Sequence, residues 1–114
     1  MTRGEIYIAA TRGAYTGKPR PVVIVQDDRF DATASVTICP FTTNPTDAPL
    51  IRIQIEPSRD NGLDRPSSLM VDKLTTVPRS GLGELLGRLR DDELVRLNRS
   101  LMVFLGLAAA PAPA

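Results

Sequence analysis

The sequence predicts a small, mainly β domain, a partly open β-barrel with one helix at its C-terminal end. Short apolar or alternating runs are separated by Gly, Pro, Asn and Asp, a pattern typical of small barrels. The one long segment with helical spacing comes last, from residue 91 to residue 105. A chain of 114 residues has the length of one domain and can bury roughly two-thirds of its unfolded surface.

Two strands are predicted in the first part of the chain. Residues 5–9 alternate between apolar and polar and predict a half-buried strand, and residues 11–17 predict a loop. The β-branched run Val22–Val25 predicts a buried strand. Arg20 stands between two prolines, which restrict its backbone to extended geometry. We expect Arg20 to be held stiffly where this strand begins, although an arginine solvated beside a strand start fits the same residues.

The middle of the chain predicts three further strands. They are Val36–Cys39, Leu50–Glu56 and Ser67–Val71. We expect Pro40 to end the first of them, because proline cannot donate to a strand ladder. The charged segment 27–31 contains three carboxylates, but their spacing does not match a calcium loop, which favours a solvated turn over a metal site.

The C-terminal part is less uniform. Residues 74–80 are ambiguous and suit a short helical turn, whereas residues 84–89 predict a last strand with leucines that would also suit a helix. Asp91 is the expected N-cap of the closing helix, and Gly106 is expected to end it. The apolar stripe of this helix is wide, which fits either a subunit interface or deep packing. We expect one domain over residues 1–107 and a disordered Ala/Pro tail over residues 108–114.

Composition excludes several kinds of chemistry. The chain has no histidine, which excludes a Ser-His-Asp triad, a histidine acid–base pair and the usual zinc sites. Its lone Cys39 is expected to be a small buried filler. The net charge is +1, yet residues 1–26 carry four cationic side chains against Glu5 alone, a local field suited to phosphates. No signal peptide or membrane span is apparent, so we expect a soluble cytoplasmic protein.

Several segments together resemble the MazF/PemK toxins of toxin–antitoxin pairs. The segments are Arg3-Gly4-Glu5-Ile6-Tyr7, Lys18-Pro19-Arg20-Pro21-Val22-Val23, Pro40-Phe41-Thr42-Thr43, Gly62-Leu63, Val71-Asp72, Leu82 to Leu89 and Leu105-Gly106-Leu107. The resemblance implies an SH3-like barrel that forms a homodimer and binds a cognate antitoxin. It also implies the toxin of a type II system, a sequence-selective endoribonuclease of single-stranded RNA that uses no metal or other cofactor. Attack by the RNA 2′-hydroxyl would leave 2′,3′-cyclic phosphate and 5′-hydroxyl ends.

The same resemblance implies the site residues. The catalytic pair corresponds to Arg20 and Thr42, and Asp72 and Lys73 correspond to family positions near the bound base. Lys18, Arg12 and Thr43 are further expected substrate contacts. Lys73 stands where many members have glutamine, and Ala9-Ala10 stand where many have an acid, so the sequence predicts no cleavage motif. A guanidinium fork suits the stabilisation of a phosphoryl group, whereas its pKa above about 12 disfavours proton abstraction.

Two alternatives use the same fold. A gyrase poison like CcdB would end in Trp-Gly-Ile, whereas this chain has no tryptophan and ends in Ala and Pro. A catalytically silent RNA-binding barrel is the other alternative, because a fold does not dictate activity. For inhibition, we expect an acidic antitoxin segment to cover the loop 11–17 together with Lys18 and Arg20.

Overall fold

A computed structural model describes residues 1–10 and 18–108 of the chain. The strands and the helix are β1 (Glu5–Ala9), β2 (Arg20–Ile24), β3 (Ser35–Thr42), β4 (Arg52–Ile55), β5 (Ser67–Met70), β6 (Thr75–Pro78), β7 (Leu82–Arg88) and α1 (Asp91–Phe104). Short 3₁₀ turns lie at Asp28–Phe30, Val71–Lys73 and Arg79–Gly81. Of the described helices, none combines the length and the hydrophobicity needed to span a bilayer.

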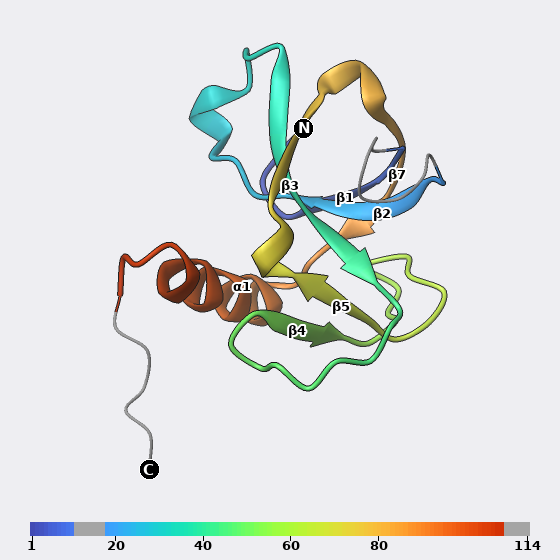
Figure 1. Cartoon of the computed structure of the whole chain (residues 1–114). Coiled ribbons are helices and arrows are strands. Elements are labelled where there is room, and N and C mark those ends of the chain that lie inside the picture. Colours follow the sequence, from blue (N-terminus) through green and yellow to red (C-terminus); the bar gives the residue numbers. More distant parts are fainter. Residues whose placement is uncertain (11–17, 109–114) are drawn as a thin grey trace.

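The strands form one antiparallel sheet in the order β4-β5-β3-β2-β1-β7, with β6 paired to β3 beside this path. Strand β3 joins the two halves of the sheet (Figure 1). Its first part pairs with β6 and β2, and its last two residues, Phe41 and Thr42, pair with Leu69 and Ser68 of β5. The sheet does not close on itself, so the predicted partly open, mainly β fold with a C-terminal helix is confirmed.

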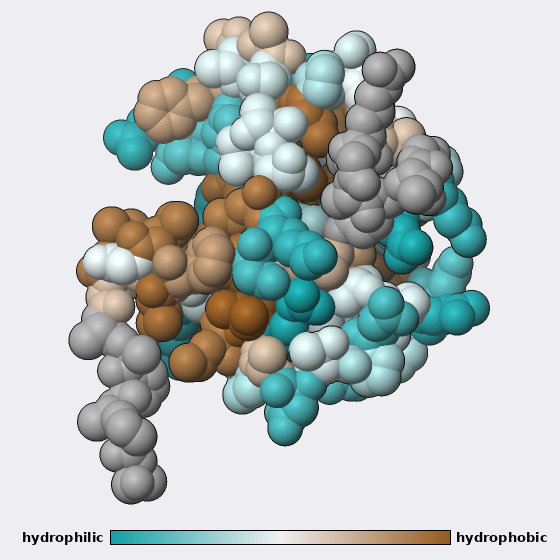
Figure 2. Space-filling model, viewed as in Figure 1, coloured by the Kyte–Doolittle hydropathy of each residue, from teal (hydrophilic) through white to brown (hydrophobic). Residues whose placement is uncertain are grey.

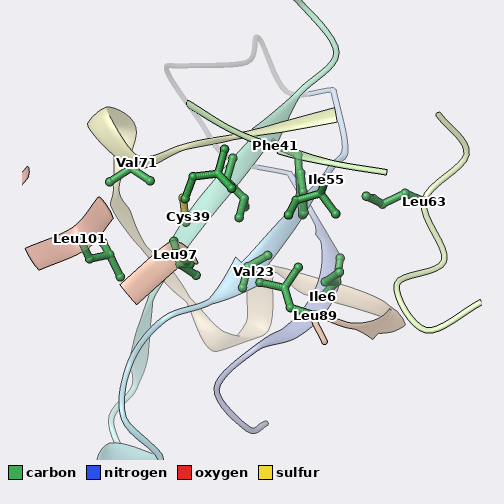
Figure 3. Close-up of a cluster of buried hydrophobic side chains, with 12 residues drawn as sticks. Ile6, Val23, Cys39, Phe41, Ile55, Leu63, Val71, Leu89, Leu97 and Leu101 are labelled. Carbon is green, nitrogen blue, oxygen red and sulfur yellow. The ribbon is translucent and has the colours of Figure 1, made fainter. Parts of the chain in front are cut away.

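The larger core cluster lies between the sheet and α1. Leu97 and Leu101 of α1 pack with Cys39 and Phe41 of β3 in this cluster (Figure 3). Burial of such side chains contributes about 1.5–3 kcal/mol each, before the entropy of ordering them is subtracted. A smaller cluster, which includes Val22 and fills the other face of the sheet, packs against β6. Strand β3 is therefore held from both faces.

Two sequence-based boundaries were wrong, and the structure assigns one segment that the sequence left ambiguous. Pro40 does not end the third strand, which continues to Thr42. At Pro40 only β2 pairs with β3, so one side of the backbone has no strand partner and proline is tolerated there. Residues 75–78 form strand β6, and the helical turn occupies only Arg79–Gly81. The N-cap of α1 is Arg90, whose backbone N–H donates to Glu93 Oε1 at 2.9 Å.

Candidate active site

Strands β2 and β3 bring Arg20 and Thr42 to one site. Val22 pairs with Pro40 at the end of the β2–β3 ladder, and Arg20 and Thr42 each lie two residues beyond this pair on their strands. Both residues line a hollow of about 390 Å³, called the Arg20–Thr42 hollow below. The extension of β3 beyond Pro40 is what carries Thr42 to this position.

Thr42 brings a hydroxyl to the lining of the hollow. Its side chain is nearly buried, with 7% of the residue exposed. The backbone N–H of Asn44 donates to Thr42 Oγ1 at 3.1 Å. A hydroxyl that already accepts this bond keeps its own hydrogen for another acceptor, such as a phosphoryl oxygen.

Cationic side chains predominate around the hollow. Lys18, Arg20 and Arg65 line it, against the single carboxylate of Asp64. Arg20 is half-buried where β2 begins, whereas the other three side chains are exposed. Such a wall attracts an anion, and a guanidinium can bind two oxygens of one phosphate.

The hollow continues into a second one. This neighbour, of about 470 Å³, shares Thr42, Thr43 and Ser67 with the first. It extends past Pro45 along the loop that follows β3. Two hollows in series suit an extended polymer better than a small compact ligand.

Asp72 and Lys73 lie away from the hollow. Asp72 accepts two hydrogen bonds from Arg52, Nε to Oδ1 at 2.9 Å and Nη2 to Oδ2 at 3.1 Å. Lys73 is exposed at the end of the same 3₁₀ turn. Neither residue lines the Arg20–Thr42 hollow. Arg12, the remaining predicted contact, lies outside the described residues.

The ion pair with Arg52 makes Asp72 a pH-dependent contributor to stability. Hydrogen bonds from Arg52 lower the pKa of Asp72 below its usual 3.8, even though burial acts in the opposite direction. A lowered folded-state pKa stabilises the fold above the ordinary pKa, and this stabilisation is lost as the pH falls through the folded-state value.

We therefore expect Asp72→Asn to lower the free energy of unfolding by about 1.5–3 kcal/mol at pH 7. The difference from wild type should narrow below about pH 4, as the wild-type carboxylate becomes protonated. Urea unfolding across this pH range measures both effects. Asp92→Asn is the control, since its side chain is 74% exposed and lies 3.6 Å from Arg90. Equal decreases in the free energy of unfolding for the two variants would contradict a specific role for the Arg52–Asp72 pair.

Cys39 is a core residue, as the sequence predicts. It is fully buried in β3, and burial raises the pKa of its thiol to about 12. A thiol with this pKa is protonated at neutral pH and is a poor nucleophile.

The acidic segment 27–31 forms a capped turn. Asp27 accepts a hydrogen bond from the backbone N–H of Arg29 at 2.9 Å and caps a 3₁₀ turn. Within residues 1–10 and 18–108, no group of three or more Cys, Asp or Glu side chains is arranged to hold a metal ion.

Three polar residues of the hollow are absent from the sequence-based site: Asp64, Arg65 and Ser67. Asp64 and Arg65 belong to the connection before β5, which is rich in turn-forming residues, and Ser67 is the first residue of β5. The turn signal Asn61-Gly62 locates this connection without indicating which strands it approaches.

The sequence matches a known protein family over most of its length. Residues 2–105 match the family described as the PemK-like, MazF-like toxin of type II toxin–antitoxin systems. The chain belongs to this family. It is 67% identical over 108 residues to a probable endoribonuclease MazF of Mycolicibacterium smegmatis, covering 95% of this chain and 99% of the relative. It is also 30% identical to the endoribonuclease MazF of Staphylococcus saprophyticus, over 94% of this chain and 92% of that protein.

Solved MazF structures share the fold. The Mycobacterium tuberculosis toxin MazF-mt6 superposes with a TM-score of 0.78 at 26% identity, over 91% of this chain and 98% of that one. A mycobacterial endoribonuclease in complex with its cognate antitoxin gives a TM-score of 0.79 at 26% identity, over 96% and 99% of the two chains. Both solved chains therefore match this chain over nearly its whole length.

Proposed function

We propose that this MazF-like toxin is an endoribonuclease that cleaves single-stranded RNA at the Arg20–Thr42 hollow. One observation carries the proposal: an arginine, Arg20, and a nearly buried threonine, Thr42, line the same hollow. The chain is also 67% identical to a probable MazF endoribonuclease, and this similarity favours RNA cleavage over the gyrase-poison and silent-barrel alternatives.

RNA itself supplies the nucleophile. The 2′-oxygen attacks the adjacent phosphorus, the bond from phosphorus to the 5′-oxygen breaks, and a 2′,3′-cyclic phosphate and a 5′-hydroxyl result. One proton leaves the 2′-hydroxyl, and one proton reaches the departing 5′-oxygen. Holding the 2′-oxygen in line with the leaving oxygen supplies a large part of such a rate enhancement.

The protein stabilises the negative charge that gathers on the phosphoryl oxygens. The guanidinium fork of Arg20 binds two of these oxygens, and the Thr42 hydroxyl donates to one of them. Each well-placed donor contributes about 10²–10³ in rate. Lys18 and Thr43 then contact neighbouring parts of the same strand, because both line the hollow. Asp72 and Lys73, which lie elsewhere, are proposed to meet RNA farther along its path.

The working unit proposed is a cytoplasmic homodimer that a cognate antitoxin silences. Apolar side chains gather over α1 (Figure 2), and several are exposed, among them Val95, Met102 and Phe104. An exposed apolar patch of this kind is typical of a protein interface. We expect the antitoxin to cover the cationic wall at Lys18 and Arg20. The rest of the expected antitoxin surface, residues 11–17, lies outside the described residues.

The test is an incubation of purified protein with a mixed pool of single-stranded RNA in excess chelator. We expect fragments with 2′,3′-cyclic phosphate and 5′-hydroxyl ends, identified by end-specific ligation and mapped by sequencing. Fragments with 5′-phosphate ends would contradict the chemistry. A gyrase-supercoiling assay run in parallel would detect the alternative poison.

A further inference from the structure

The connection between β4 and β5 forms a fixed wall of the Arg20–Thr42 hollow. Its residues Leu63, Asp64 and Arg65 line the hollow, although the sequence indicates only turns there. Leu63 is buried in the main core cluster (Figure 3). The segment is therefore anchored immediately before its two charged residues.

The side chain of Asn61 holds the backbone of this connection through hydrogen bonds. Its side chain is fully buried, which is rare for an asparagine unless its polar atoms are satisfied. Oδ1 accepts from the backbone N–H groups of Ser58 at 3.0 Å and Leu63 at 2.9 Å, and Nδ2 donates to the carbonyl of Glu56 at 2.8 Å. One side chain thus fixes the backbone on both sides of the turn.

The turn also docks against β7. The backbone N–H of Arg88 donates to the carbonyl of Asp60 at 2.7 Å. A Cβ on Gly87 would lie 2.1 Å from this carbonyl oxygen, and a Cβ on Gly62 would lie 2.4 Å from the carbonyl oxygen of Leu86. Backbone approaches this close require glycine at both positions. The connection is consequently held by β7 as well as by the core.

Arg65 is presented to the hollow from this anchored segment. The hydroxyl of Ser67 donates to the backbone carbonyl of Arg65 at 3.0 Å, and Pro66 restricts the backbone between them. The side chain of Arg65 is exposed, and no carboxylate among the described residues lies within 4.0 Å of its guanidinium. An exposed guanidinium with a fixed backbone is suited to bind an anion that enters the hollow.

We infer that Arg65 is a substrate-binding residue, which holds a phosphate of the RNA strand next to the one that is cleaved. The inference rests on the proposed function, because it places the RNA in the hollow that contains Arg20 and Thr42. Arg20 enters the hollow from β2, whereas Arg65 enters it from the connection before β5. Two guanidinium groups on separate elements can bind two successive phosphates and fix the strand between them.

Arg65 contacts phosphate, so it contributes to affinity and not to the chemical step. We expect Arg65→Ala to raise KM and Kd about tenfold, as for the loss of one charge-assisted hydrogen bond. The kcat should stay near wild type, because the contact is equal in ground and transition states. The slope of log Kd against log salt should fall by about 0.7, the value for one phosphate contact on a single strand. Arg65→Lys should keep this slope, since it keeps the charge.

The binding probe is a single-stranded oligonucleotide with deoxyribose at the cleaved linkage, titrated by fluorescence anisotropy at several salt concentrations. Arg59→Ala is the matched control, because Arg59 is an exposed arginine of the same connection that does not line the hollow. If Arg65→Ala and Arg59→Ala give the same Kd and salt slope, the inference is overturned. A kcat that falls with unchanged Kd would also overturn it. Failure of wild-type protein to cleave RNA would instead refute the proposed function.

Discussion

Arg20→Ala should lower the rate of RNA cleavage by about 10³-fold or more while the protein stays folded. The guanidinium is the group best suited to the two phosphoryl oxygens on which charge develops, and Arg20 lines the same hollow as Thr42. Arg20→Lys should restore little activity, because an ammonium lacks the planar fork that binds two oxygens at once. Single-turnover cleavage of an RNA with a mapped site measures both variants.

Controls separate this effect from loss of fold or of general charge. Arg29→Ala removes the same charge from a side chain that is 82% exposed beside Asp27, and it should cleave like wild type. Thermal unfolding should show that Arg20→Ala remains folded. A folded Arg20→Ala variant with near-normal cleavage would contradict the assignment of Arg20.

Thr42→Ala should slow cleavage by about 10²-fold and leave RNA binding nearly intact, as expected for one lost donor.

Much of the fold follows from local patterns in the sequence. The β-branched run before Gln26 and the leucines of the closing helix each indicate one element, and the buried stripe of α1 includes Leu97 and Leu101 as its spacing predicts. The errors occur where tertiary pairing outweighs local preference. Pro40 remains inside β3 because only one side of the strand is paired there, and local sequence does not reveal this arrangement.

The site was predictable in part for a related reason. Arg20 and Thr42 adjoin strands that the sequence does predict, and the family resemblance singles them out. Asp64 and Arg65 belong to a connection whose position depends on β7, more than twenty residues later along the chain, through the bond between Arg88 and Asp60. A contact between residues so far apart along the chain produces no periodic pattern in the sequence. From the sequence, Asn61 indicates only a turn, whereas the structure shows that its buried side chain bonds three backbone groups.

Dependence on the 2′-hydroxyl is the second large effect that we expect. In the proposed reaction this oxygen is the nucleophile, so its removal leaves no group to attack phosphorus. Arg20 and Thr42 still line the hollow and can still bind the phosphate, so affinity should change little. Cleavage should nevertheless disappear, in contrast to the partial loss expected for Thr42→Ala. A water-activating nuclease would cut the deoxy linkage and leave no cyclic phosphate.

The most direct measurement compares two oligonucleotides that differ only by a single 2′-deoxy substitution at the mapped linkage. Wild-type protein in excess chelator should cut the all-ribose strand to a 2′,3′-cyclic phosphate and leave the substituted linkage intact, while it binds both strands with similar affinity. Cleavage of the deoxy linkage at a comparable rate would contradict attack by the substrate hydroxyl, and with it the proposed role of the Arg20–Thr42 hollow.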